Sequence, residues 1–302
     1  MSVQLFDLAA HGRIKVTGED RARLLHAMTT NHVQGLKPGE GLYAFFLNAQ
    51  GRIQADVHIL CFPDHLLLDT EPETRALVFE HLDRYIIADD AYVEDITETT
   101  FCLTLEGDGA LELAALAALP LPVARFSHST ADGVTVAAIS TTGAPAIRLY
   151  GPAGAKADLL TRLLAAGAAE GTPEQLETAR IRNFVPRFGA DITASTLPQE
   201  SQMMHAVHFQ KGCYLGQEIV ERVRSRGHVN RTLMGFRFEG ETAPPAPTPL
   251  TVDDKETGEV TSSVASADGV FGLAYVRGPH NKPGTMVTIG GHPAQLFAPA
   301  GI

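Results

Sequence analysis

Along the first sixty positions, hydrophobic residues recur at the spacings that are typical of short strands and helices. Gly12 to Thr17 has the pattern of a strand, and Asp20 to Met28 places its large apolar residues on one side of a helix. Leu42 to Leu47 and Ile53 to Cys61 form two more strand patterns around a glycine-containing turn at 48–51. We therefore predict a strand, a helix and then a β-hairpin.

The second strand of this hairpin carries polar side chains on one face only. Its odd positions from Ile53 to Cys61 are apolar, whereas Gln54, Asp56 and His58 occupy even positions. Strict alternation places Asp56 and His58 on the same polar side. That side either lines a pocket or faces water.

The central part of the chain predicts a second unit of strands and helices. Thr70 and Glu73 have capping-box spacing ahead of a helix that reaches Ile86, and a strand is expected at 92–96. Residues 101–164 then form a βα-type unit, with strands near 101–105, 134–139 and 146–150. Thr172 begins another capping box.

The last 120 residues change from helical patterning to short strands. The helix after Thr172 is expected to end before Pro186, and residues 187–208 have so little periodicity that they form a long loop, often a functional feature. A proline-rich segment at 241–249 follows a strand at 233–238. Further short strands at 258–263, 269–276 and 286–289 indicate a small β-barrel or sandwich.

Composition and charge exclude several classes of protein. The 302 residues are 44% hydrophobic and 20% charged, as in an ordinary globular protein. A net charge of -11 argues against nucleic-acid binding by bulk electrostatics. The chain contains no apolar run long enough to span a membrane and no signal-peptide pattern, so we expect no membrane partner and a cytoplasmic location.

The three cysteines are too few for a self-contained cluster site. Cys61, Cys102 and Cys213 are widely separated and form no Cys-x-x-Cys pair, whereas cysteine-ligated clusters normally take four thiolates. His205 and His208 have a spacing that fits one helical face, but no third ligand is evident. We predict no permanent metal.

The most informative motif is Lys211-Gly212-Cys213-Tyr214-Leu215-Gly216-Gln217-Glu218. Its cysteine lies between glycines and just ahead of a helical pattern, where a thiolate would be stabilised by Lys211 and by the helix N-terminus. The alternative is a cysteine that acts as a small buried hydrophobe. The setting favours a reactive thiol.

This motif closely resembles the signature of the YgfZ family of folate-binding proteins. That family is related to the aminomethyltransferase, or T-protein, of the glycine cleavage system, and it includes mitochondrial iron-sulphur assembly factors. The resemblance extends over most of the chain through the segments 16–31, 47–56, 180–189 and 197–200. The chain departs from T-protein where relatives usually carry two adjacent aspartates, because it has Ala55-Asp56.

The resemblance implies an α+β fold with two α+β units around a central folate cavity and a small C-terminal β-barrel. We expect the folate-binding region to cover residues 1–235, with an inner subdomain at about 98–165, and the barrel to cover 236–302.

The resemblance also implies a set of folate contacts. Asp56 is expected to hydrogen-bond the reduced pterin, and Glu200 to accept two N–H groups from its amide and amino edge. Lys211, Gln217, Arg222 and Arg231 are expected to accompany them, the two arginines toward the glutamate tail or a partner. The alternatives are a solvated strand face for Asp56, helix caps for Glu200 and Gln217, and a solvated helix face for the arginines.

Three functions follow from these residues. The first is a tetrahydrofolate-binding protein that supports iron-sulphur cluster assembly or repair, with iron-sulphur client or assembly proteins as partners. In it Cys213 acts as nucleophile, redox sensor or transient ligand. The second is a folate-dependent aminomethyl or methyl transferase with Asp56 as general base. The third is a non-catalytic scaffold with no folate affinity.

Overall fold

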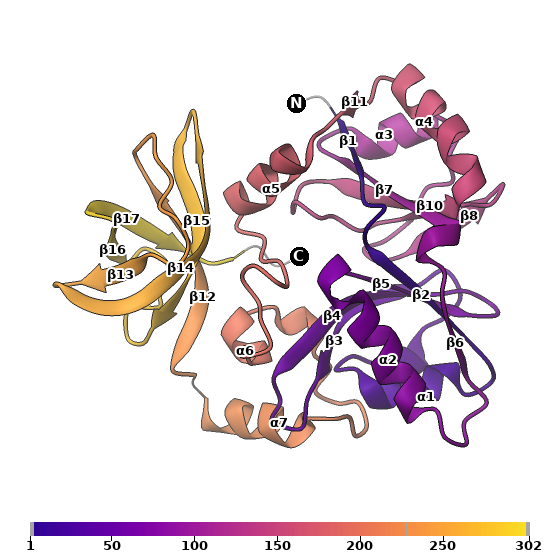
Figure 1. Cartoon of the computed structure of the whole chain (residues 1–302), viewed down its shortest axis with the longest axis horizontal. Helices are drawn as coiled ribbons and strands as arrows, with labels where there is room; N and C mark the ends of the chain where they lie inside the picture. The colour runs from indigo at the N-terminus through magenta and orange to yellow at the C-terminus, as the bar shows by residue number, and fades with distance from the viewer. Residues whose placement is uncertain (1–2, 228, 300–302) are drawn as a thin grey trace.

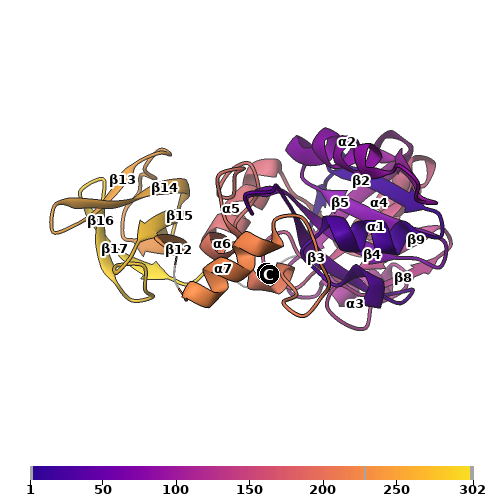
Figure 2. The ribbon, with the colours of Figure 1, turned by 90° about the horizontal axis from the view of Figure 1, so that it is seen from below.

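The computed structural model describes residues 3–227 and 229–299. It contains two open β-sheets at one end and a closed β-barrel at the other (Figure 1). Three helices lie between them: α5 (Pro173–Arg182), α6 (Pro198–Ser201) and α7 (Gln217–Arg226). The view from below shows the same three-part arrangement, with the barrel well separated from the sheets (Figure 2). The predicted α+β class with a C-terminal barrel is confirmed.

The first sheet has five antiparallel strands in the order β3-β4-β5-β2-β6. Its strands are β2 (Gly12–Thr17), β3 (Gly41–Leu47), β4 (Ile53–Cys61), β5 (Leu66–Thr70) and β6 (Tyr92–Asp95). Helices α1 (Arg21–Met28) and α2 (Arg75–Tyr85) cover one face, where Leu25 and Leu82 pack on the apolar side of β4. The alternation predicted for β4 therefore buries Val57 and Ile59 under the helices and directs Asp56 to the opposite face.

The predicted capping box at Thr70 is wrong. Thr70 is the last residue of β5, and its hydroxyl donates to the Asp56 carbonyl at 2.7 Å. Helix α2 begins only at Arg75 and has no side-chain cap. The hydroxyl is thus used inside the sheet, next to the predicted pocket residue.

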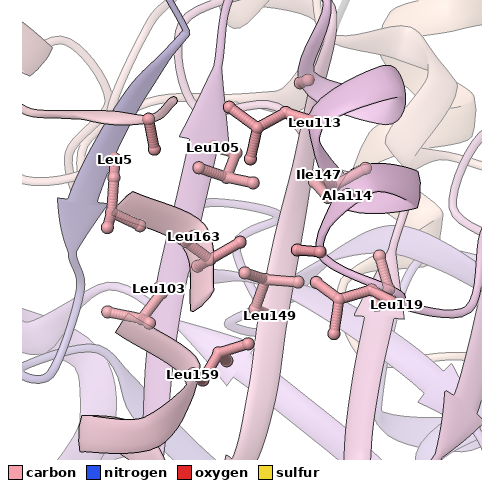
Figure 3. Close-up of a cluster of buried hydrophobic side chains, with 14 of the residues drawn as sticks. Leu5, Leu103, Leu105, Leu113, Ala114, Leu119, Ile147, Leu149, Leu159 and Leu163 are labelled. Carbon is pink, nitrogen blue, oxygen red and sulfur yellow. The ribbon is translucent and has the colours of Figure 1, made fainter. Parts of the chain in front are cut away.

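The second sheet has six strands in the order β11-β1-β7-β10-β9-β8. Its strands are β1 (Gln4–Asp7), β7 (Thr100–Glu106), β8 (His128–Ala131), β9 (Val134–Ala137), β10 (Ala146–Pro152) and β11 (Ala169–Glu170). Helices α3 (Ala110–Leu116) and α4 (Lys156–Ala165) cover its outer face, where leucines of both helices interdigitate with those of β7 and β10 (Figure 3). Each fully buried leucine there contributes about 1.5–3 kcal/mol.

The two sheets pack against each other through a separate apolar cluster. Leu60 and Leu67 from the first sheet meet Cys102, Ala137 and Tyr150 from the second. Because β1 and β11 complete the second sheet, the subdomain expected at 98–165 also recruits residues 4–7 and 169–170. Short 3-10 turns occur at Val33–Gly35, Pro72–Thr74, Thr97–Thr99, Ala153–Ala155 and Met204–Ala206.

The C-terminal unit is a closed six-stranded antiparallel barrel in the order β12-β15-β14-β13-β16-β17. Its strands are β12 (Arg231–Phe238), β13 (Pro249–Val252), β14 (Lys255–Ser266), β15 (Gly269–Arg277), β16 (Met286–Ile289) and β17 (His292–Phe297). The boundary expected at 235/236 falls within β12, which pairs with β15 from Arg231 to Phe238. The barrel therefore starts at Arg231.

The connection between the sheets and the barrel contains α5, α6 and α7, and the loop predicted at 187–208 holds only α6 and a 3-10 turn. The Thr172 capping box forms as expected, and α5 ends at Arg182, before Pro186. None of the helices within residues 3–227 and 229–299 combines the length and apolar character that crossing a bilayer requires.

Candidate functional site

A polar cavity lies where the two sheets meet the long loop. Strands β4 and β5 contribute Asp56 and Asp69, β10 contributes Arg148, and the loop contributes Arg187 and His205. It leaves about 50 Å³ for the centres of water molecules, which is room for several waters. The remaining lining residues are His11, Tyr43, Val57, His58, Thr70, Glu71, Ser140, Thr141, Arg180, Val185 and Pro186.

Asp56 is the carboxyl group with unused hydrogen-bonding capacity in this cavity. The Tyr43 hydroxyl donates to its Oδ2 at 2.6 Å, while its Oδ1 is buried without any partner. The residue is only 8% exposed. Burial, followed by the nearby Glu71 carboxylate, raises the pKa of Asp56 to about 7. The group can therefore accept a hydrogen bond, and it can gain or lose a proton near neutral pH.

Asp69 has the opposite environment, although it lies in the same cavity. Its carboxylate accepts hydrogen bonds from Arg148 at 2.6 Å, from the Tyr150 hydroxyl at 2.6 Å and from His11 at 3.1 Å. Burial alone would raise the pKa of Asp69, but Arg148 and His11 hold it well below its usual value. Asp69 therefore differs from Asp56 in that its carboxylate has three hydrogen-bond donors.

A second ion-pair network fixes the loop to the cavity. The Arg187 guanidinium bonds to Glu71 at 3.1 Å and to Glu73 at 2.9 Å. Arg180, on α5, pairs with Asp191 at 2.6 Å in a fully buried contact. Both arginines line the cavity: Arg187 pairs the loop with the segment that follows β5, and Arg180 pairs α5 with the loop.

The Lys211-to-Glu218 motif forms a separate feature next to α1. Lys211 is buried, and its ammonium group donates to the carbonyls of His26 and Thr29 at the end of that helix. Burial lowers the pKa of Lys211 to about 7. Cys213 is exposed to solvent. The lysine therefore anchors the loop that presents the thiol.

The glycine at the start of α7 seats this motif on the β3–β4 hairpin. Gly216 has φ +82°, and a Cβ there would lie 2.6 Å from the Asn48 carbonyl oxygen. Only glycine allows both the left-handed backbone and this close approach. The turn predicted at 48–51 is thus the surface on which the motif rests.

Glu200 occupies a third location. Its carboxylate accepts the Leu197 N–H at 2.9 Å, which caps α6, and it lies 3.6 Å from Arg52 and 3.5 Å from Arg231. The Arg231 guanidinium also lies 4.3 Å from the Tyr275 ring centroid. The helix-cap alternative for Glu200 is therefore observed, together with two ion pairs.

Comparison with known families agrees with this division of the chain. The GCVT N-terminal domain matches residues 1–211, and the CAF17 C-terminal beta-barrel domain matches residues 230–301. The chain belongs to the GCVT family. Its barrel places it in the YgfZ/CAF17 lineage, which confirms the resemblance seen in the sequence.

Relatives of this GCVT-family protein include a putative chloroplastic transferase of Arabidopsis thaliana, which is 28% identical over 297 residues and covers 95% of this chain and 68% of that protein. An aminomethyltransferase of Rubrobacter xylanophilus is 29% identical over 294 residues, covering 94% of this chain and 78% of that protein. The mitochondrial iron-sulfur cluster assembly factor IBA57 homolog of Mycosarcoma maydis is 28% identical over 253 residues, covering 78% and 57%. The crystal structure of the glycine cleavage system aminomethyltransferase T from Bartonella henselae superposes on this chain with a TM-score of 0.90 at 20% identity. The match covers 100% of this chain and 86% of that one, and it shows that the two share a fold.

The GCVT fold brings few of the predicted site residues together. Asp56 lines the cavity, whereas Glu200, Lys211, Gln217, Arg222, Arg231 and Cys213 are not among its lining residues. Gln217 begins α7, and exposed Arg222 pairs with Glu218 one turn earlier at 2.5 Å. Their roles toward folate, and that of Asp56, stay predictions. Among the described residues, no group of three or more His, Cys, Asp or Glu side chains is placed to hold a metal ion.

Several cavity residues had not been identified from the sequence. Tyr43 lies opposite His58 in the β3–β4 hairpin and therefore near Asp56. The register of the two strands was the signal that could have identified Tyr43 as a cavity residue. Asp69 stands as a lone carboxylate among the leucines of β5, which is a signal for a buried charge. Arg148, Glu71 and Arg187 come from distant segments and carried no such signal.

Proposed function

We propose that this GCVT-family protein binds a reduced folate in the Asp56 cavity and supports the assembly or repair of iron-sulphur proteins. The single observation that carries the folate part is the buried Oδ1 of Asp56, which has no partner while Oδ2 is held by Tyr43. A buried acceptor without a donor is costly, so its persistence at the head of a polar cavity favours a ligand that supplies an N–H group.

Tetrahydrofolate fits the donors and acceptors of this cavity. Asp56 would hold an N–H edge of the pterin, and Tyr43 and His205, whose rings stack on each other with centroids 5.3 Å apart, line the same cavity. When bound, the cofactor supplies a carrier for a one-carbon unit. The residues of this chain would orient it and move a proton at the Asp56 carboxyl, whose pKa lies near 7.

The iron-sulphur part rests on the lineage and on the thiol. The IBA57 homolog that this chain resembles is named as an assembly factor, and the chain covers 57% of its length. Cys213 is solvent-exposed on a loop anchored by Lys211, so a client or assembly protein can reach it. We propose such proteins as partners and the cytoplasm as the location.

A folate-dependent aminomethyl or methyl transferase is the second candidate. It is supported by the pKa of Asp56, which suits a general base near neutral pH, and by the aminomethyltransferase relatives. The exposed thiol has no part in it. The two candidates therefore differ in whether Asp56 or Cys213 is indispensable in the cell.

Anaerobic calorimetric titration with tetrahydrofolate tests the folate site, since the chain has no tryptophan for fluorescence quenching. We expect binding by the unmutated protein, at least tenfold weaker binding by Asp56→Asn, and unchanged binding by Cys213→Ala. If the unmutated protein does not bind tetrahydrofolate, both folate-dependent functions are excluded and only the non-catalytic scaffold remains.

The second arm uses cells that lack this protein. The activity of an iron-sulphur enzyme is measured after complementation with each variant. Loss of complementation by Cys213→Ala supports the assembly function. Full complementation by Cys213→Ala together with loss by Asp56→Asn supports the transferase instead.

A further inference from the structure

Asp56 is not the only group in its cavity that lacks a hydrogen-bond partner. Nδ1 of His58, Nε2 of His205 and Nε of Arg148 are also buried without one, and all three residues line the same cavity. Most buried polar atoms in proteins are paired, so four unpaired atoms on residues that line one cavity are unusual. Either ordered waters or a ligand must satisfy them.

The two histidines are held by aromatic contacts rather than by hydrogen bonds. The His205 ring stacks on Tyr43 with centroids 5.3 Å apart and planes 25° apart. The His58 ring lies 4.9 Å from Tyr43 and 5.6 Å from Phe126. These contacts fix the ring planes while leaving polar edges free, which is how a site orients a planar ligand.

Both imidazoles are neutral at physiological pH. Burial lowers the pKa of His58 to about 3, with Arg148 adding to the effect, and burial lowers the pKa of His205 to about 4, with Arg125 adding to it. The other titratable groups that act on His58 are Asp69, His205 and His11. A neutral imidazole has one N–H donor and one lone pair, so each ring can match either kind of edge on a heterocycle.

We infer that His58 and His205 are ligand-orienting residues of the Asp56 cavity, each hydrogen-bonding the polar edge of a planar pterin-type heterocycle. This inference rests on the proposed folate function. Asp56 accepts an N–H group of the ligand, and the imidazole N–H groups donate to ring nitrogens or a carbonyl oxygen, which an ionised carboxylate cannot bind.

Replacement by phenylalanine separates this role from a structural one. Phenylalanine keeps the ring that packs on Tyr43, but it removes the unpaired nitrogen. We expect His205→Phe and His58→Phe each to weaken tetrahydrofolate binding about tenfold while the melting temperature stays the same or rises. Stability is retained because the lost polar atom had no protein partner.

His81 provides a matched control on α2. Its Nε2 is also buried without a partner, and its ring contacts Phe46 and Tyr85, but it does not line the cavity. His81→Phe should give the same response in melting temperature and leave tetrahydrofolate affinity unchanged.

The outcomes separate this inference from the proposed function. If the unmutated protein binds no tetrahydrofolate, both are overturned. If Asp56→Asn abolishes binding while His58→Phe and His205→Phe bind normally, the folate site stands, the nitrogens are satisfied by water, and this inference is wrong. If a Phe variant binds weakly and also melts lower, His205→Gln decides, since recovery of affinity by the amide supports the inference and continued weak binding overturns it.

Discussion

The Tyr43 hydroxyl donates a 2.6 Å hydrogen bond to one oxygen of Asp56 and leaves the other oxygen of that carboxyl unpaired. The bond stabilises the ionised form and opposes the effect of burial and of Glu71. Tyr43 is the largest of the groups that favour the ionised carboxylate, ahead of the backbone N–H of Asp56 and of His11.

Removal of that hydroxyl should shift the balance toward the protonated acid. In Tyr43→Phe we expect the pKa of Asp56 to rise above its value of about 7, by roughly one to two units, as expected for loss of a hydrogen bond to a charged group. Carbon-detected NMR titration of labelled aspartate carboxyls measures it. Tyr85→Phe, at an exposed tyrosine outside the cavity, should leave the titration unchanged. If the titration midpoint of Asp56 is unchanged in Tyr43→Phe, the Tyr43 hydrogen bond does not set the pKa of Asp56.

Asp56 should make the fold less stable as pH rises. Its pKa is about 7 in the folded protein against 3.8 as the ordinary value, so between pH 4 and 7 the unfolded chain loses a proton that the folded chain retains. The stabilising contribution is fully present below pH 4 and is lost by pH 7, on the order of 4 kcal/mol.

Urea unfolding of the unmutated protein and of Asp56→Asn at several pH values isolates this contribution. His58 and His205, whose pKa values are lowered by burial, contribute with the opposite sign, whereas His11, whose pKa is raised, contributes with the same sign; all three are present in both proteins. We expect the free-energy difference between the two to change steadily from pH 4 to pH 7 and then level off. Parallel stability curves would show that Asp56 titrates normally.

The two glycines that flank α7 should differ in how much their replacement by alanine destabilises the protein. Gly216 and Gly227 both have positive φ, +82° and +77°, so each substitution incurs a backbone cost of about 1 kcal/mol. At Gly216 the new Cβ also meets the Asn48 carbonyl at 2.6 Å, whereas Gly227 faces open space. We expect Gly216→Ala to lower the unfolding free energy by about 1–3 kcal/mol more than Gly227→Ala. Equal losses in chemical denaturation would mean that the motif does not rest on the hairpin turn.

Thiol reactivity should single out Cys213. Cys102 is fully buried and Cys61 nearly so, and burial raises the pKa of both thiols, whereas Cys213 is exposed. Iodoacetamide labelling of the native protein, followed by peptide mass spectrometry, should modify Cys213 at least tenfold faster than the others. All three should react alike in denaturant, and Cys213→Ser should remove the fast phase. If the three cysteines are labelled at comparable rates in the native protein, the loop that carries Cys213 is not accessible as described.

The sequence predicted features that depend on neighbours along the chain. The alternation in β4 placed Asp56 and His58 on one face, and both line the cavity. The strand pattern after the proline-rich segment predicted a barrel or sandwich, and the structure is a barrel. Each of these follows from local periodicity, which a single segment contains.

The rest of the site depends on pairings between distant segments. Arg148 reaches Asp69 because two different sheets stack, and His205 reaches Tyr43 because an aperiodic loop folds back onto β3. The predicted effect of Lys211 on the thiol stays a prediction; its ammonium group donates to the carbonyls of His26 and Thr29 at the end of α1, a contact that no spacing in the motif encodes.

The position of β1 imposes an order on folding as the chain leaves the ribosome. Residues 12–95 contain the whole first sheet, so that sheet can close while synthesis continues. Residues 4–7, made before both of their partners, must wait for β7 at 100–106 and for β11 at 169–170 before they acquire both neighbours. A truncation that removed β1 would leave one edge of β7 with unpaired backbone groups, and a second copy of the chain could pair with that edge.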